Sequence, residues 1–294
     1  MTSPTWCQAN VAFPDWERAE SVALARLTPL LRAAEDDGAL TAWFIMRKHP
    51  CWRVRYLPAA DGQDRISQGL DFLITEGSIT AWTENIYEPE SRAFGGDEAM
   101  ASAHRLFHRD SRSLIDFLQS DAGRHRRETS LMLCSLMMRS AGLDWYEQGD
   151  VWARVGAHRA LPPRTEQGNS DRLLSAVHRF LSVNGEEMMR AGGPLAHAAE
   201  WASAYADAGS ELARLADSGQ LRRGLRDVLA HHVLFAWNRI GLPYSTQAVL
   251  AATAAIAIFG PRPHDRPRKE DRTPCGSPVT PGTTVVRLPL NGPV

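Results

Sequence analysis

The stretch from Thr83 to Leu118 constrains the fold most, because it joins a polar strand end to a long amphipathic helix. From Asp97 onward, apolar residues recur at steps of three and four, which predicts a helix with one buried face. Asp97 is expected to cap that helix. Just before the Gly95-Gly96 pair the chain gathers polar side chains that few purely structural segments need: Tyr87, Glu88, Glu90, Ser91 and Arg92.

Two interpretations of this polar cluster remain open from the pattern alone. The Gly95-Gly96 pair allows a sharp turn with positive φ, so the cluster would sit where helix N–H groups and the positive dipole end face outward. Functional groups are commonly held at such positions. Alternatively, the segment is a polar hairpin edge followed by an ordinary amphipathic helix.

The order of the expected elements predicts an α+β fold: a mostly antiparallel sheet covered by helices, with a helical C-terminal half. Strands are expected at 40–46, 52–57 and 79–87. Helices are expected at 15–36, 66–75, 97–118, 130–142, 145–155, 171–181, 194–216, 221–240 and 245–259. The last helix is apolar on almost every side, which predicts deep burial. One domain is expected over 1–260, followed by a flexible Pro/Gly-rich tail at 261–294.

Composition argues against several classes of protein. The formal net charge is −1 and the pI is near 6.8, so neither nucleic acids nor membranes are expected partners. The most apolar stretch, 248–259, is too short to span a bilayer, and the first twenty residues do not resemble a signal peptide. We expect a cytoplasmic protein whose widely spaced thiols form neither a zinc site nor a disulfide framework: Cys7, Cys51, Cys134 and Cys275.

The second expected strand contains the sequence WRVRY, which places Arg53 and Arg55 on one face and apolar side chains on the other. Two arginines on one strand face can bind a carboxylate or carbonyl groups. The alternative is a solvated outer face of the sheet.

The helix at 221–240 carries the remaining candidates. His231 and His232 are adjacent and cannot point the same way, so either one is an acid or base, or both are ordinary core or surface residues. Asn238 and Arg239 end this helix and can cap carbonyls or pair with an acid. The chain has no P-loop, GxGxxG, HExxH or GxSxG motif, so spacing alone does not define a function.

Three sequence blocks, in order, carry a family resemblance: AWFIMRKHPCWRVRY, NIYEPESRAFGGDEAMASAHRLFHRDS and HHVLFAWNRIGLPYSTQAVLAA. Together they resemble the thiopeptide-type bacteriocin biosynthesis family, which is similar to the C-terminal elimination domain of lantibiotic dehydratases. The resemblance covers most of residues 40–260. It implies one of two reactions on a ribosomally made, leader-bearing peptide. The domain either eliminates glutamate from glutamylated Ser or Thr, or joins two dehydroalanines into a six-membered nitrogen ring. It implies no metal or redox cofactor, and other biosynthetic enzymes as further partners.

Two departures from the family pattern favour ring formation. Eliminating members usually read E-x-x-R-Y-G-G, whereas this chain has Ala93 at the arginine position, and it has Ala236 where they tend to carry a second histidine. Glutamate elimination needs a base and a cation that steadies the developing charge. Because Arg53 and Arg92 remain, the eliminating component of a split dehydratase stays the alternative.

The resemblance implies a thiopeptide pyridine synthase that performs a formal [4+2] aza-cycloaddition with loss of water and leader peptide. Its expected proton-handling residues are Tyr87, Glu90, Ser91 and His232. Its expected substrate-binding residues are Arg53, Arg55, Arg92, Asn238 and Arg239, of which the last two can instead hold the site together. A third hypothesis, from another class, is a non-catalytic scaffold that binds the leader peptide.

Overall fold

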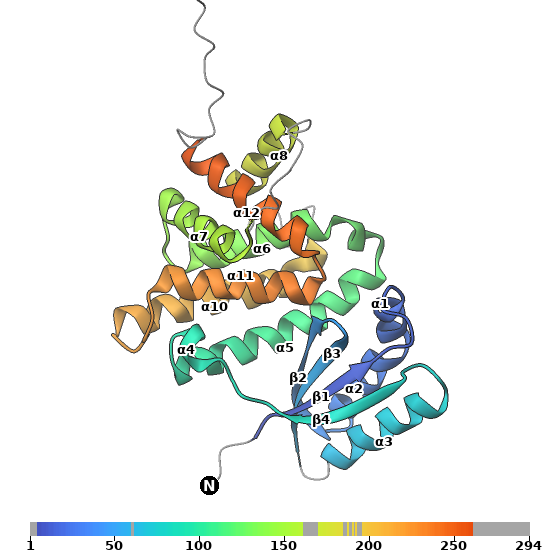
Figure 1. Ribbon diagram of the computed structural model, residues 1–294. Helices are drawn as coiled ribbons and strands as arrows, with labels where there is room; N and C mark the ends of the chain where they lie inside the picture. The colour runs from blue at the N-terminus through green and yellow to red at the C-terminus, as the bar shows by residue number, and fades with distance from the viewer. Residues whose placement is uncertain are drawn as a thin grey trace, which may run out of the picture. The chain divides into compact units, whose positions relative to one another are not determined.

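An antiparallel sheet of four strands lies below the helices of the second half of the chain in the view of Figure 1, which shows the computed structural model. The structure describes residues 5–59, 62–160, 170–184, 187, 190, 192 and 196–260. The strand order is β2-β3-β1-β4. The strands are β1 (Cys7–Ala12), β2 (Leu40–Lys48), β3 (Cys51–Pro58) and β4 (Ala81–Ile86).

Strand β1 is the one strand of this sheet that the sequence analysis did not predict, and it lies between β3 and β4. Its side chains alternate: Ala9 and Val11 have no exposed surface, whereas Gln8 and Asn10 point to the other face. The alternation spans only six residues and half of it is polar, so its periodicity is too short to stand out. The three predicted strands are confirmed, with bounds that differ by one or two residues.

One face of the sheet is covered by helices from the N-terminal part of the chain. These are α1 (Ala19–Val22), a π-helical turn (Ala23–Leu27), α2 (Thr28–Asp36) and α3 (Gly62–Thr75). The helix predicted at 15–36 therefore begins at Ala19, and it is π-helical from Ala23 to Leu27 between two α-helical segments. Pro29 lies in the first turn of α2, where a missing N–H costs little. The core between these layers includes Leu27, Leu31, Trp43, Trp52 and Val54.

The second half of the described chain is helical, which confirms the predicted α+β class. Helix α6 lies at its centre, since every residue from Ser130 to Met138 is buried. Short 3-10 turns occur at Asp121–His125 and Ala196–Ala198. The helices are α4 (Ser91–Phe94), α5 (Asp97–Gln119), α6 (Arg126–Ser140), α7 (Trp145–His158), α8 (Ser170–Ser182), α10 (Ala199–Asp217), α11 (Leu225–Ile240) and α12 (Tyr244–Phe259).

The predicted deep burial of the last helix is wrong. Only one face of α12 is buried, and Tyr244 and Phe259 are 55% and 52% exposed. The apolar sequence conceals this because α12 packs against α7 and α8 on one side only. In the part of the chain that the structure describes, no helix is both long and apolar enough to cross a membrane. The predicted tail at 261–294 lies outside the described residues, and the division at residue 260 stays a prediction.

A buried ion pair, together with two hydrogen bonds to its carboxylate, joins three of these helices. The Nε of Arg239 on α11 donates to Asp110 on α5, and both side chains are almost fully buried. Asp110 Oδ1 also accepts hydrogen bonds from α10, from Trp201 Nε1 at 2.6 Å and Tyr205 Oη at 2.9 Å. The Arg239 guanidinium lies 4.3 Å from the ring centre of Phe107. The Asp110 carboxylate is therefore the common partner of α5, α10 and α11.

Replacing Asp110 by alanine is expected to destabilise the fold strongly, because it leaves the buried Arg239 charge unpaired. We expect the free energy of unfolding in urea to fall by about 3–5 kcal/mol. Asp116→Ala is the matched control on the same helix, because Asp116 is exposed and pairs with Arg32 at the surface, where a loss of about 1 kcal/mol or less is expected. Equal losses in the two variants would contradict the role given to Asp110.

Candidate active site

The free face of the sheet carries a row of polar side chains. Strand register places Arg55 beside Phe44 on β2 and Gln8 on β1, and Gln8 beside Asn85 on β4. A second row lies two residues further along: Met46, Arg53, Asn10 and Thr83. Both rows face away from α2 and α3, because the alternate residues of each strand form the core on that side.

Arg55 is a fixed cation within this row. Its side chain is buried, its Nε donates to Gln8 Oε1 at 2.8 Å, and its guanidinium carbon lies 4.5 Å from the centre of the Tyr87 ring. Burial lowers the pKa of Arg55, and the nearby Arg53 lowers it further. The predicted placement of both arginines on one face is confirmed, and the alternative of a solvated outer face is wrong for Arg55.

Tyr87 and His104 form a neutral hydrogen-bonded pair next to this cation. Tyr87 Oη lies 2.8 Å from His104 Nε2, and Trp6 packs against the imidazole at 4.5 Å between ring centres. Burial raises the pKa of Tyr87 to about 12. Burial, with a contribution from Arg55, lowers the pKa of His104 to about 4. Near pH 7 the pair can therefore present either a donor or an acceptor, depending on the imidazole tautomer.

Glu90 and His231 form a second pair. His231 Nε2 donates to Glu90 Oε2 at 3.0 Å. This hydrogen bond lowers the pKa of Glu90, and the charges of Arg55 and Lys48 lower it further, so Glu90 is a carboxylate at neutral pH. The two pairs differ in charge state although Arg55 lies next to both.

His232 occupies the core instead of this surface. Its ring packs edge-on against Phe94 at 4.8 Å, and neither of its nitrogens has a hydrogen-bond partner among the described residues. Burial lowers the pKa of His232 to about 3. The expected divergence of the two adjacent histidines is confirmed. The role of His232 as an acid or base stays a prediction, and it is His231 that reaches Glu90.

Asn238 and Arg239 bind residues of neighbouring helices. Arg239 has no exposed surface and cannot touch a substrate in this conformation, which corrects the substrate-binding interpretation. Asn238 Oδ1 accepts a hydrogen bond from Gln247 Nε2 on α12 at 3.1 Å. Both residues hold helices together, as the alternative expected. Ser91 is half-buried as the first residue of α4, and Arg92 is exposed beside it.

Sequence reasoning missed His104 and Gln8. His104 follows Met100 by four residues and precedes Phe107 by three, so it is a polar side chain within the buried stripe of α5. A polar residue within this apolar stripe was the sequence signal that could have identified His104 as a site residue. Gln8 was missed with its strand, since its contact with Arg55 depends on the register between β1 and β3.

The Gly95-Gly96 pair makes the turn that aims the cluster. Both residues have positive φ, 94° and 113°. A side chain on Gly95 would come within 2.6 Å of Leu221, so the close approach also requires glycine there. Gly96 is the N-cap of α5, and Asp97 is its first helical residue, which corrects the predicted cap.

The two alanines that depart from the eliminating pattern have different surroundings. The carbonyl of Ala93 accepts a hydrogen bond from Arg223 Nη1 at 2.7 Å, so the guanidinium near this position binds the main chain. Ala236 is buried and lies one turn after His232 on the same side of α11.

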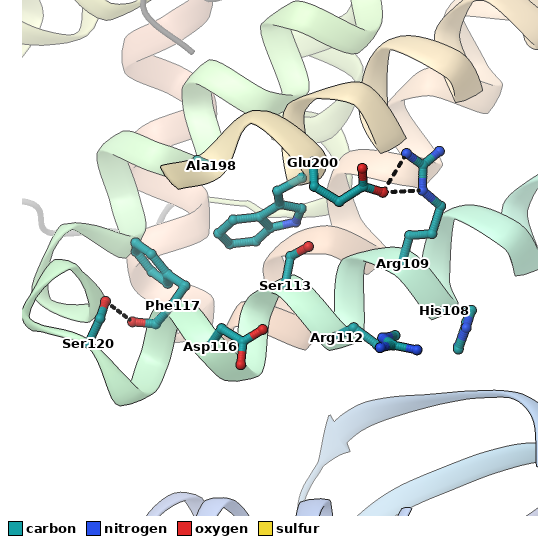
Figure 2. A pocket seen from close by; sticks show the side chains of 10 residues that line it. His108, Arg109, Arg112, Ser113, Asp116, Phe117, Ser120, Ala198 and Glu200 are labelled. Carbon is teal, nitrogen blue, oxygen red and sulfur yellow. Dashed lines mark hydrogen bonds and ion pairs between the residues drawn. The ribbon is translucent and has the colours of Figure 1, made fainter. Parts of the chain in front are cut away.

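A cavity of about 570 Å³ lies elsewhere, between α5 and the start of α10 (Figure 2). The arginines that line it are paired with acids: Arg109 Nη2 lies 2.8 Å from Glu200 Oε1, and Arg112 pairs with Glu35. None of the predicted site residues lines it. The Arg55 face is therefore the better candidate, since it joins a cation, a carboxylate and two residues with strongly shifted pKa values.

The family model described as "Lantibiotic biosynthesis dehydratase C-term" matches residues 6–258. The chain belongs to this family. The match spans the sheet, the Arg55 face and every described helix up to α12. No functionally curated protein matches the chain significantly.

Three solved structures have a fold similar to that of this chain, and they differ in how much of their own length the chain covers. It is 17% identical to the tRNA-dependent lantibiotic dehydratase MibB from Microbispora sp. 107891, with a TM-score of 0.58, over 88% of this chain and 29% of that one. It is 17% identical to TsrL (TM-score 0.58), over 90% of this chain and 99% of that one. It is 14% identical to TbtD, a pyridine synthase from thiomuracin biosynthesis, with a TM-score of 0.59, over 86% of this chain and 97% of that one.

Acid is expected to destabilise the protein through His232. The unfolded chain binds a proton at this histidine below about pH 6.5, whereas the folded chain does not until about pH 3. Since the unfolded state then holds more protons, the free energy of unfolding decreases as pH falls below 6.5, by roughly 3 kcal/mol at pH 4.5 from this residue. Urea unfolding of His232→Leu across this range should show a shallower pH slope.

The control for this experiment is His158→Leu, because His158 is exposed at the end of α7. It should keep the slope of the unchanged protein. An unaltered slope in His232→Leu would show that the buried imidazole does not titrate as described.

Proposed function

We propose that the chain is a thiopeptide pyridine synthase that acts on a dehydrated, azole-bearing, leader-bearing peptide. The observation that carries the proposal is the neutral Tyr87–His104 pair held beside the Arg55 cation. Support also comes from the similarity in fold to TbtD, which covers nearly the whole of both chains. The proposed reaction requires no metal or redox cofactor.

The proposed reaction needs proton movement at neutral pH. The amide preceding one dehydroalanine becomes its iminol, so a proton leaves nitrogen and one is delivered to oxygen. The resulting azadiene forms two carbon–carbon bonds with the second dehydroalanine: its terminal carbon bonds the other terminal carbon, and the former carbonyl carbon bonds the other α-carbon. Loss of water and then of the leader as an amide gives the aromatic ring.

The residues of the Arg55 face suit these steps. Tyr87 Oη, backed by neutral His104, donates a proton to or accepts one from the tautomerising amide. Arg55 binds the carbonyl oxygen on which the iminol proton resides, because it is a preorganised cation. Glu90, oriented by His231, accepts a proton during aromatisation. Arg53 lies one step along the same sheet face and binds a neighbouring carbonyl.

Tyr87→Phe tests the carrying observation, since it removes the hydroxyl and leaves the ring that stacks on Arg55. We expect ring formation, followed by mass spectrometry of the released leader peptide, to slow by about 10²–10⁴-fold. Peptide binding should be unchanged. Tyr146→Phe is the control, because Tyr146 is exposed on α7 and should react normally. Normal cyclisation by Tyr87→Phe would contradict the role given to this hydroxyl, whereas peptide binding without any ring formation by the unchanged protein would favour the scaffold hypothesis.

Glutamate elimination is the competing function, and a glutamylated peptide separates the two. The chain lacks the arginine and the second histidine that eliminating members of the family tend to carry, because Ala93 and Ala236 stand at those positions. We therefore expect no loss of glutamate and no new dehydroalanine by mass spectrometry. Release of glutamate from that peptide, without ring formation from the dehydrated one, would reverse the assignment.

A further inference from the structure

Strand β4 presents an unpaired edge. Within the described residues it pairs with β1 alone, so its outer side has no strand partner. Trp82 is half-buried, and the other five residues of the strand are exposed. Ile86, at its end, is 89% exposed.

The opposite edge of the sheet is covered. At β2, the backbone N–H of Ile45 donates to Ser111 Oγ at 3.3 Å. His108 Nδ1 lies 3.2 Å from Trp43 N and 3.0 Å from its carbonyl oxygen. Side chains of α5 thus bind the main-chain groups of β2, so the two edges differ.

The sequence of β4 contains few features that discourage pairing with another strand. Edge strands of soluble proteins usually carry lysine, proline or a bulge. The sequence AWTENI contains neither lysine nor proline, its single charged residue is Glu84, and its six pairs with β1 run without a shift in register. A regular edge ending in an exposed isoleucine can accept another extended chain.

The position of β4 suggests what that chain is. Asn85 lies in the same cross-strand row as Arg55, and the next residue after the strand is Tyr87. A hollow of about 730 Å³ lies at this end of β4, lined by Trp6, Ile86 and Tyr87 among others. A peptide paired along β4 would thus be led to the candidate active site.

We infer that β4 binds an extended segment of the peptide substrate by strand addition. The inference takes the nature of the peptide from the proposed function. Main-chain hydrogen bonds along β4 hold the segment whatever its sequence, and alternate side chains contact the two faces of the strand. The hollow beside Ile86 offers Ile86 and Trp6 to an apolar or heteroaromatic side chain, and its polar lining includes Gln63, Glu84 and Asn85.

Amide hydrogen exchange with mass spectrometry tests this inference, with the dehydrated, azole-bearing, leader-bearing peptide as the probe. At saturating peptide we expect exchange within 81–86 to slow about tenfold, because outward N–H groups gain partners, while exchange within 145–158 in α7 is unchanged. Unchanged exchange within 81–86 would overturn the inference. Protection that grows with protein concentration when peptide is absent would also overturn it, since the edge would then bind a second copy.

Two variants sharpen the result. Ile86→Lys places a charge at the exposed end of β4 and is expected to raise the Kd of the peptide about tenfold. Phe72→Lys is the matched control, because Phe72 is a comparably exposed apolar residue on α3, and it should bind normally. Equal affinity in both variants would overturn the role of Ile86 and of the edge.

The cyclisation assay separates this inference from the proposed function. Ring formation without protection of β4 means that strand addition is wrong while the function stands. Protection of β4 without ring formation means that the edge binds the peptide and the chain does a different reaction.

Discussion

The buried pair of Asp110 and Arg239 sets the geometry on which the candidate site depends. It joins α5 to α11, and the site takes one histidine from each of these helices, His104 and His231. Because buried charges with strong partners tolerate little displacement, the pair fixes the separation of the two histidines. The adjacent Trp201 and Tyr205 bring α10 into the same framework. Buried charges thereby position the groups proposed to move protons.

Arg55 divides the site into two parts with different protonation. On one side burial keeps Tyr87 and His104 neutral, and on the other a hydrogen bond keeps Glu90 ionised. The charge of Arg55 lowers the pKa of His104 and of Glu90, which favours neutral His104 and ionised Glu90. For Tyr87 it opposes the larger effect of burial. A site with separate neutral and ionised pairs can handle several proton transfers in sequence. This arrangement suits a reaction with a tautomerisation and two eliminations better than a single proton abstraction.

Local patterns predicted the elements well and the contacts unevenly. The stripe of α5 and the Gly95-Gly96 turn were readable because each depends on residues close in sequence. The partner of Glu90 was not, since the choice between His231 and His232 depends on how α11 rotates against α4. Gln8 was missed with β1, whose place in the sheet is decided by strands more than forty residues away. Long-range register, unlike periodicity, has no signature in a single segment.

Helix α5 both covers one edge of the sheet and contributes a residue to the candidate site. Helix α5 covers β2 with His108 and Ser111, and one turn earlier it supplies His104 to the site. Covering β2 hinders strand addition on that side, so within the described part of the chain β4 is the open edge, and it leads into Tyr87. The same helix that completes the proton-handling pair thus also limits the direction from which a substrate can approach it.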